Sequence, residues 1–312
     1  MTPGWGARIA MLAGCTATAA AFQAPSAVPG DMQAVLTRIA DRVESYYVRA
    51  QSIVCLETVR LQPLGSDLGF DGRARTLTYE LRIAWDPPAD GKTPEARVVR
   101  QILKVNGRPP KPDDDDGCMD PKPVSPEPLE MLLPGNREDY RFTFAGTARV
   151  DGRAALRLDY RALAKGLAAV TWKDPCVSIE LPGWSRGRVW VDSDTNDVLR
   201  LDEQLVGMFE FPIPRKHQLP GGGPRYMTIE RADSSIRYRR VAFHDPDETL
   251  LLPESIEALT IIRGSGVPRL RVVQSFSDYK RFLTGGRLVK PPQTGFYGST
   301  VLRFYGSTVL RF

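Results

Sequence analysis

A five-residue stretch of this chain has the spacing of a catalytic serine turn. Residues 183–187, Gly-Trp-Ser-Arg-Gly, match G-x-S-x-G, in which an exposed serine attacks an ester or amide carbonyl. That turn needs a strand before it and a helix after it, but residues 188–192 read as a strand. Only two histidines, His217 and His244, could serve as the base. We therefore predict a glycine-rich turn here. A serine hydrolase with Ser185 as nucleophile is kept as one alternative function, after the two given at the end of this subsection.

Acidic side chains in the next segment have the spacing of a calcium loop. Oxygen-bearing residues fall at positions 1, 3, 5 and 12 of that pattern, at Asp192, Asp194, Asn196 and Glu203. Position 6 needs glycine for the sharp bend and is Asp197 here. The flanking residues read as strands, whereas the loop of that pattern lies between helices. We therefore predict a hairpin turn whose side chains bond the local backbone.

The remaining polar clusters do not have the spacing of a metal site. His217 and His244 have no cysteine, histidine or glutamate partner at ligand spacing, and the run Asp113–Asp116 reads as a solvated loop. The sequence contains neither a phosphate-binding loop nor a dinucleotide fingerprint. We predict no metal site, no catalytic residue and no cofactor.

Four cysteines divide into different predicted roles. Cys118 and Cys176 both lie in proline- and aspartate-rich loops, and we favour a disulfide between them. Cys55 lies in an apolar strand, where a free buried thiol behaves as a small hydrophobic side chain. Cys15 belongs to the N-terminal segment considered below.

Aromatic residues gather on the predicted strands or at their ends. One interpretation is an ordinary core. The other is that some of them line a cavity between a curved sheet and the N-terminal helix, because a concave apolar cavity is where ligands bind. The candidates for such a cavity are Tyr79, Leu81, Phe142, Phe144, Tyr160, Trp190 and Tyr238.

The elements that must position these residues are mainly strands. In residues 76–84 the apolar side chains alternate with polar ones, a period of two that predicts an antiparallel strand with one buried face. Residues 31–50 have apolar residues at helical spacing behind Asp31, a suitable N-cap, and predict one amphipathic helix. We predict loops over 107–128 and 211–224, a short helix over 126–133 and a final helical turn over 277–283. Eleven strands are expected, near 53–62, 74–85, 96–106, 138–148, 153–161, 168–181, 187–193, 197–206, 226–244, 249–263 and 268–276.

The two ends of the chain are predicted to lie outside this domain. Residues 1–21 resemble a secretory signal ending in Ala-Ala-Ala, followed by a linker over 22–30. A competing interpretation is a lipobox, Leu-Ala-Gly-Cys, in which Cys15 is lipidated after cleavage. No later segment approaches the length of an apolar membrane span, so we expect an exported, periplasmic protein, either soluble or anchored through Cys15. Residues 285–312 end in two copies of YGSTVLRF and read as a tail of low order.

Two hairpin patterns are similar to those of bacterial lipoprotein carriers. Residues 150–160, with the sequence Val-Asp-Gly-Arg-Ala-Ala-Leu-Arg-Leu-Asp-Tyr, resemble one strand pair of that family. The sequence Gly-Arg-Val-Trp-Val-Asp at 187–192, followed by Val-Leu-Arg-Leu at 198–201, resembles another. The family comprises the Lol-type periplasmic chaperone, its outer-membrane acceptor and a related envelope-stress sensor domain. The resemblance covers residues 31–284. It implies a curved antiparallel sheet, or unclosed β-barrel, of about 11 strands covered by an N-terminal helix, and carries over no functional residue.

Composition agrees with a globular envelope protein. The chain is 42% hydrophobic and 25% charged, and 42 Lys and Arg against 37 Asp and Glu give a net charge of +5. The basic residues are spread along the strands rather than clustered, so we predict no nucleic-acid partner. We predict a non-enzymatic cell-envelope protein that binds a lipid, acyl chain or lipoprotein in a concave apolar face. The alternative is a structural or protein-interaction module of the periplasm, with envelope proteins as partners.

Overall fold

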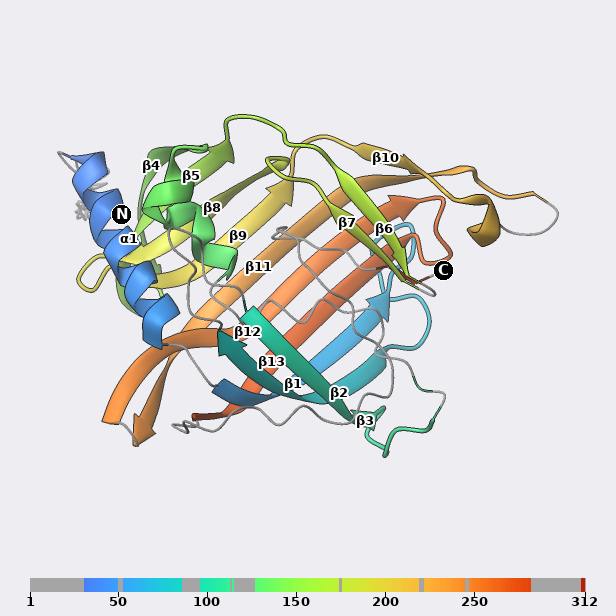
Figure 1. Ribbon diagram of the computed structural model, residues 1–312, viewed down its shortest axis with the longest axis horizontal. Coiled ribbons are helices and arrows are strands. Elements are labelled where there is room, and N and C mark those ends of the chain that lie inside the picture. Colours follow the sequence, from blue (N-terminus) through green and yellow to red (C-terminus); the bar gives the residue numbers. More distant parts are fainter. Residues whose placement is uncertain are drawn as a thin grey trace, which may run out of the picture.

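Strands make up most of the computed structural model of this protein (Figure 1). It describes residues 31–49, 53–85, 96–112, 114, 127–173, 176–218, 222–244, 247–281 and 310–311. Its helical elements are α1 (Met32–Arg49), η2 (Glu127–Leu132), α2 (Pro134–Arg137) and η3 (Arg215–His217). Its strands are β1 (Ile53–Pro63), β2 (Arg75–Trp85), β3 (Ala96–Val105), β4 (Tyr140–Val150), β5 (Arg153–Ala162), β6 (Ala169–Lys173), β7 (Cys176–Glu180), β8 (Ser185–Asp192), β9 (Val198–Leu205), β10 (Phe209–Pro212), β11 (Tyr226–His244), β12 (Asp247–Arg263), β13 (Arg269–Arg281) and β14 (Leu310–Arg311).

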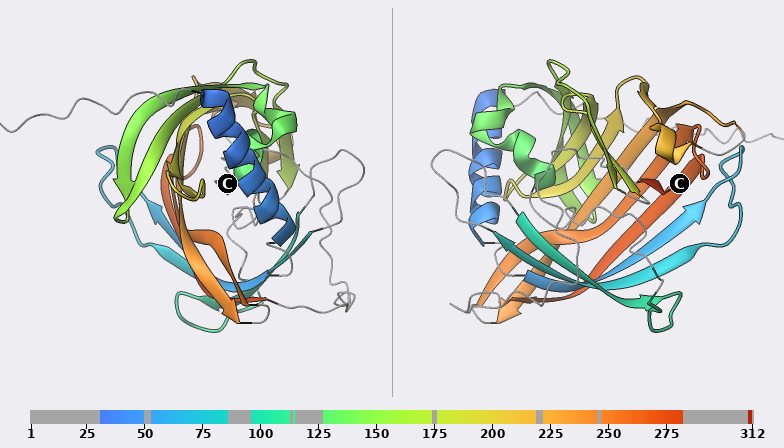
Figure 2. Two further views of the ribbon diagram at one scale, coloured as in Figure 1. Left: turned by 90° about the vertical axis from the view of Figure 1, so that its left-hand side faces the viewer. Right: turned by 45° about the vertical axis from the view of Figure 1, so that its right-hand side comes forward.

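One antiparallel sheet of 11 strands forms the body of the molecule. Its strands follow the order β3-β2-β1-β13-β12-β11-β9-β8-β5-β4, and β10 pairs with β11 off this path. The two end strands, β3 and β4, do not pair with each other, so the sheet curls without closing (Figure 2). The predicted fold class, a curved and unclosed antiparallel sheet of about 11 strands with an N-terminal helix, is confirmed.

Alternation along each strand gives the sheet two different faces. In β2, Leu77, Tyr79, Leu81 and Ile83 are buried, while Arg82 between them is exposed. We call the face toward α1 the inner face and the opposite one the outer face. The sheet curls around the inner face, which is therefore concave (Figure 2).

The helix α1 covers one end of the inner face together with η2. Asp31 caps it as predicted, because its Oδ1 accepts hydrogen bonds from the backbone N–H groups of Gln33 at 2.9 Å and Ala34 at 3.1 Å. Apolar residues at helical spacing then face the sheet. The buried ones are Val35, Leu36, Ile39, Ala40 and Val43.

A second, smaller sheet covers the other end. It consists of the β6–β7 hairpin with β14 beside β7, and it lies in front of the main sheet in Figure 1. Val177, Ile179 and Leu181 pack with Phe211 of β10 and Ile229 of β11 in a separate apolar cluster. The inner face therefore has an α1 end and a hairpin end.

Three element predictions are corrected by the structure. The range 168–181 contains two short strands, β6 and β7, rather than one, because its two halves pair antiparallel with each other. The predicted helical turn over 277–283 is instead the end of β13, where Lys280 and Arg281 pair with β1. The predicted loop 211–224 begins inside β10 and contains η3.

Several other predictions lie partly or wholly outside the described residues. These are the signal segment 1–21 with Cys15, the linker 22–30, Cys118 and hence the Cys118–Cys176 disulfide, and the tail 285–312 apart from β14. Cys55 is free and buried as predicted, and burial raises the pKa of its thiol to about 12. In the described ranges, no helix has the length and apolar character of a membrane span.

Candidate functional site

The inner face at the α1 end is an apolar surface built by most strands of the main sheet. Its buried residues and those of α1 and η2 form one continuous cluster. Aromatic rings of β4 and β5 line one side of it, because Phe142 lies opposite Tyr160 in the register and their ring centroids are 6.1 Å apart. The sheet contributes Cys55, Leu81, Ile83, Leu158, Tyr160, Val189, Val191, Val198, Leu201, Ile236, Tyr238, Ile256 and Phe276.

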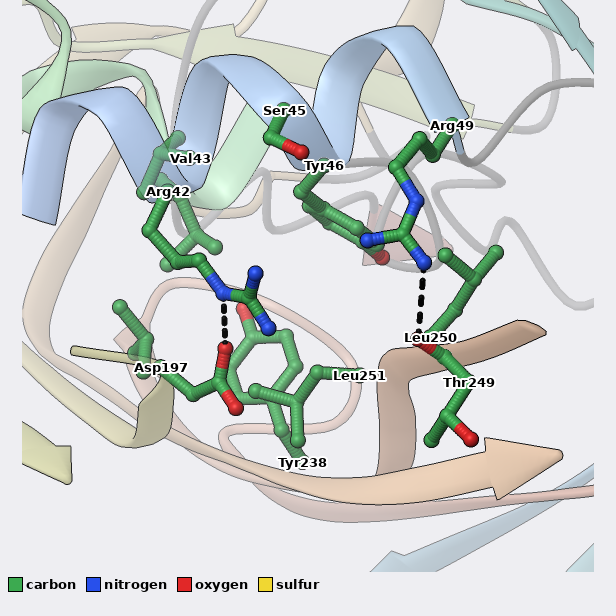
Figure 3. A pocket seen from close by; sticks show the side chains of 12 residues that line it. Arg42, Val43, Ser45, Tyr46, Arg49, Asp197, Tyr238, Thr249, Leu250 and Leu251 are labelled. Carbon is green, nitrogen blue, oxygen red and sulfur yellow. Dashed lines mark hydrogen bonds and ion pairs between the residues drawn. The ribbon is translucent and has the colours of Figure 1, made fainter. Parts of the chain in front are cut away.

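Ion pairs fix the C-terminal half of α1 over this surface. Asp197, buried in the β8–β9 turn, accepts a hydrogen bond from Arg42 Nε of α1 at 2.5 Å and another from Arg240 Nη2 of β11 at 3.2 Å. About two turns further on, Arg49 Nε donates to Glu248 at 3.1 Å. Figure 3 shows the Arg42 contact and the bond from Arg49 to the Thr249 carbonyl.

The charge of Asp197 is maintained despite its burial. Burial on its own raises the pKa of a carboxyl group. Hydrogen bonds and the positive charges of Arg42 and Arg240 outweigh burial and lower the pKa of Asp197 below its ordinary value. Asp197 is therefore ionised at neutral pH and attracts α1.

A small pocket remains between α1 and strands β9, β11 and β12 (Figure 3). The phenolic oxygens of Tyr46 from α1 and Tyr238 from β11 are buried there and receive no hydrogen bond from the described residues. Burial raises the pKa of both tyrosines, so both are neutral. The pocket has room for about 40 Å³, enough for water molecules, whereas ligand pockets usually exceed roughly 300 Å³. A larger ligand could occupy this surface only if α1 moved.

A buried acid lies farther along the inner face. Tyr160 of β5 donates a hydrogen bond to Glu203 Oε2 of β9 at 2.9 Å, while Glu203 Oε1 receives none from the described residues. Burial raises the pKa of Glu203 to about 8, although the bond from Tyr160 lowers it. Gly187 of β8 lies between the two, since a Cβ atom there would be 2.6 Å from the Tyr160 hydroxyl oxygen. The last glycine of the G-x-S-x-G stretch thus makes room for this hydrogen bond.

A second buried polar group joins three strands on the same face. Glu57 of β1 is fully buried and accepts hydrogen bonds from Arg100 of β3 and Gln274 of β13, both at 2.8 Å. The guanidinium of Arg100 also lies 4.6 Å from the centre of the Tyr79 ring. The inner face is thus apolar under α1 and carries two buried polar groups beyond it.

Six of the seven predicted cavity residues lie on the inner face. Tyr79 packs in a neighbouring cluster with Val59, Leu77 and Val272, and the other five belong to the cluster under α1 or pack against it: Leu81, Phe142, Phe144, Tyr160 and Tyr238.

Trp190 is placed differently from the rest. It lies on the outer face, where Arg200 is 4.6 Å and Arg188 is 5.8 Å from its ring centre. Its strand neighbours Val189 and Val191 are the ones that point inward. Because the segment Val-Trp-Val is apolar at every position, its period did not reveal which residues face the interior.

The structure shows neither a nucleophile elbow at the G-x-S-x-G stretch nor a calcium loop at the acidic segment after it. Ser185 is buried at the start of β8 after a turn, which is not the strand–turn–helix geometry of a nucleophile elbow. Asp192 caps the β8–β9 turn, since its Oδ1 accepts from the backbone N–H groups of Asp194 at 3.0 Å and Thr195 at 2.8 Å. The predicted hairpin turn is confirmed. Among the described residues, no group of three or more His, Cys, Asp or Glu could hold a metal ion.

Sequence reasoning missed the roles of Asp197 and Glu203. Both were noticed only as positions of the calcium-like pattern. Asp197 is 155 residues from Arg42 in the chain, and its role depends on where α1 docks. Glu203 continues the alternation of Leu199 and Leu201 along β9, and an acidic residue in that apolar phase was the signal that could have identified it as buried.

Comparisons with known proteins were made for both sequence and structure. No protein-family model matches the sequence, and no curated protein matches it. Among the solved structures that resemble this chain are three with low sequence identity. A candidate outer membrane lipoprotein-sorting protein domain from Vibrio parahaemolyticus is 11% identical, with a TM-score of 0.40, covering 81% of this chain and 94% of that one. A DUF1329 family protein from Desulfovibrio piger is 12% identical, with a TM-score of 0.37 and coverages of 81% and 92%.

The third is a LolA superfamily protein from Nitrosomonas europaea, which is 10% identical with a TM-score of 0.33, covering 79% of this chain and 93% of that one. A lipoprotein-sorting domain and a LolA superfamily protein are thus among the solved structures that this chain resembles. At these TM-scores the likeness shows nothing about the function of this chain.

Proposed function

We propose that this protein is a non-enzymatic binder of an acyl chain, carried by a lipid or a lipoprotein, on the inner face of its sheet. One observation carries the proposal: a concave apolar surface built by most strands of the main sheet is covered at this end only by α1 and the short element η2 in the described part of the chain. The helix contributes four large buried side chains, Val35, Leu36, Ile39 and Val43. An acyl chain offers the same kind of surface and would take the place of α1.

The free energies of the two occupants are similar. Full burial of an aliphatic side chain contributes about 1.5–3 kcal/mol, so the apolar contacts of these four side chains contribute roughly 6–12 kcal/mol to holding α1. Each buried methylene of a ligand contributes about 0.8 kcal/mol, so a chain of about 14 methylenes gains ~11 kcal/mol. A chain of about six methylenes gains only ~5 kcal/mol. Long chains should therefore displace α1, whereas short ones should not.

A displacement titration tests this dependence on chain length. A fluorescent long-chain fatty acid is bound to the full chain and then displaced by unlabelled acids of increasing length. We expect long acids to displace it and short ones to fail. No probe binding at high micromolar protein would overturn the proposal.

A matched pair of variants on β4 locates the site. Phe142 is half-buried against the inner cluster, and Thr143 beside it is exposed on the outer face. Phe142→Glu places a charge where the acyl chain would lie and should weaken probe binding at least tenfold, whereas Thr143→Glu should leave it unchanged. Circular dichroism spectra and melting curves confirm that both variants fold. Equal effects of the two variants would place any bound probe elsewhere.

The proposed location is the cell envelope, with export directed by residues 1–21. Cleavage after Ala21 would give a periplasmic protein, and cleavage before Cys15 would give a lipid-anchored one. Intact mass spectrometry of protein from the envelope fraction distinguishes the two forms by the N-terminal residue and by a diacylglyceryl mass on Cys15. An uncleaved Met1 in that material would refute export by this segment.

A second candidate is a protein-interaction module of the envelope. Within the described part of the chain, β3 pairs only with β2 and β4 only with β5, so both ends of the sheet offer a strand edge. This alternative predicts that lipid changes neither the melting temperature nor the position of α1.

A further inference from the structure

Three arginines lie directly opposite one another on the outer face. In the register of the sheet, Arg141 of β4 is paired with Arg161 of β5, and Arg161 is paired with Arg186 of β8. All three side chains are exposed. We call them the arginine row. Because directly opposed residues have Cβ atoms about 4.5–5.5 Å apart, the row brings three positive charges together.

In the neighbouring row of the same strands, opposed charges are matched. Two residues along, Asp159 of β5 lies opposite Arg188 of β8 and accepts hydrogen bonds of 2.5 and 3.0 Å from it. Asp202 of β9 follows, and accepts from Arg200 at 2.7 Å and from Ser235 at 2.7 Å. In that row acids alternate with bases.

The arginine row has no such compensation. Among the described residues, no carboxylate forms an ion pair or hydrogen bond with Arg141, Arg161 or Arg186, and the next residue in the row, Gln204, is neutral. Like charges directly opposite one another destabilise a sheet. The protein therefore retains an arrangement that costs stability, which is a reason to look for a ligand that relieves it.

The row also lines two adjoining hollows of the surface. One, of about 480 Å³, is bordered by all three arginines and contains Asp159 and Asp202, both already bonded to other arginines. The other, of about 260 Å³, shares Arg141 and Arg161 and adds Lys165. The positive charge is thus accessible and continues past the row.

We propose that the arginine row binds a phosphate group. A guanidinium presents parallel N–H donors that match phosphate oxygens, and several such groups can share one multiply charged anion. Adjacent strands are about 4.8 Å apart, so the row spans only ~10 Å, the size of one phosphate-bearing group rather than of a nucleic-acid backbone. The phosphate could belong to a lipid headgroup or to a soluble compound. Because the row lies on the outer face, this inference is independent of acyl binding to the inner face.

Two probes separate the sources of the phosphate. Inorganic phosphate is titrated calorimetrically against the full chain at constant ionic strength, and vesicles of phosphatidylglycerol are compared with vesicles of phosphatidylcholine by co-sedimentation. Binding of free phosphate alone assigns a soluble ligand, binding of phosphatidylglycerol vesicles alone assigns a headgroup, and binding of both assigns the shared group. Binding of neither overturns the proposal.

A charge-matched pair of variants tests the row itself. Arg161→Gln removes the central guanidinium, and loss of its charged hydrogen bonds should weaken binding about 10- to 100-fold. Arg237→Gln removes the same charge from an exposed arginine of β11 outside both hollows, and should leave binding unchanged. Arg161→Gln should also melt no lower than the wild type, because it relieves repulsion. If it does not fold, Arg186→Gln takes its place. Equal weakening by row and control variants would mean that only net charge matters, and would refute the site.

Discussion

Replacing Asp197 with asparagine should release the C-terminal half of α1 from the sheet. The substitution keeps the size of the side chain and removes its charge. Asp197 is buried and holds Arg42 of α1 and Arg240 of β11 at hydrogen-bond distances of 2.5 and 3.2 Å. Arg153 of β5 is a more distant third partner at 3.8 Å.

The expected loss in free energy of unfolding lies between the contribution of a buried ion pair and that of a surface ion pair. A hydrogen bond to a charged group contributes about 1.5–3 kcal/mol, whereas an exposed ion pair contributes roughly 0–1 kcal/mol. The carboxylate is buried, but the side chains of Arg42 and Arg240 are 43% and 50% exposed, so water screens their charges. We therefore expect Asp197→Asn to lower the free energy of unfolding by about 2 kcal/mol, or the melting temperature by ~4–8 °C.

The loss should depend on pH in a defined direction. The pKa of Asp197 is lowered in the folded protein, against about 3.9 in an unfolded chain. A lowered pKa stabilises the folded state above the unfolded value, and this stability disappears as the pH falls through the folded value. The difference between wild type and variant should therefore be full at pH 7 and shrink below roughly pH 4.

Urea unfolding at several pH values and hydrogen exchange of α1 provide the readouts. Asp194→Asn is the control, because Asp194 is an exposed residue of the same turn. Asp197→Asn should also speed amide exchange in α1, whereas the control should not. A loss at pH 7 no larger than that of the control, or unchanged exchange in α1, would refute the view that Asp197 holds the helix.

Two further predictions concern the buried polar pair of the inner face. Gly187→Ala should lower the free energy of unfolding, measured by urea titration, by about 3 kcal/mol or more, because the added Cβ would lie 2.1 Å from the carbonyl oxygen of Asp202. Gly135→Ala is the control and should have little effect, because its added Cβ would have no atom within 4 Å. The free energy of unfolding of Glu203→Gln should rise relative to that of the wild type between pH 5 and pH 8, by up to about 4 kcal/mol. The reason is that the pKa of Glu203 is raised to about 8 in the folded protein, so the wild type loses stability as the pH rises above the pKa of the unfolded chain. An equal difference at both pH values would show that Glu203 does not titrate in this range.

The architecture could be predicted from the sequence because the alternation of apolar and polar residues is visible in each strand even when its neighbouring strands are unknown. Leu77, Tyr79 and Leu81 could be assigned to one buried face from their spacing, and they are buried. The hairpin at 168–181 was missed because apolar residues on both sides of Asp174-Pro175 read as one run. The strand β10 was missed because Pro212 and the residues after it resemble a loop.

The site was harder to predict because its parts meet only through register and docking. Nothing in the sequence near Arg141 indicates that it lies opposite Arg161, since that pairing depends on the turn between β4 and β5 and on the irregularity between Phe144 and Gly146. The contact of Arg42 with Asp197 likewise depends on where α1 packs. Local sequence patterns show which face of a strand is buried, whereas contacts between charged residues can be identified only once the strand register and the position of α1 are known.

Photo-crosslinking with a long-chain fatty acid that carries a diazirine near its methyl end tests the central claim most directly. After irradiation of the full chain and peptide mass spectrometry, we expect the label on inner-face residues such as Leu81, Phe142 and Tyr238. A short-chain analogue should label none of them. Labelling confined to outer-face residues such as Trp190, or the same labelling with long and short chains, would contradict acyl binding in the concave face.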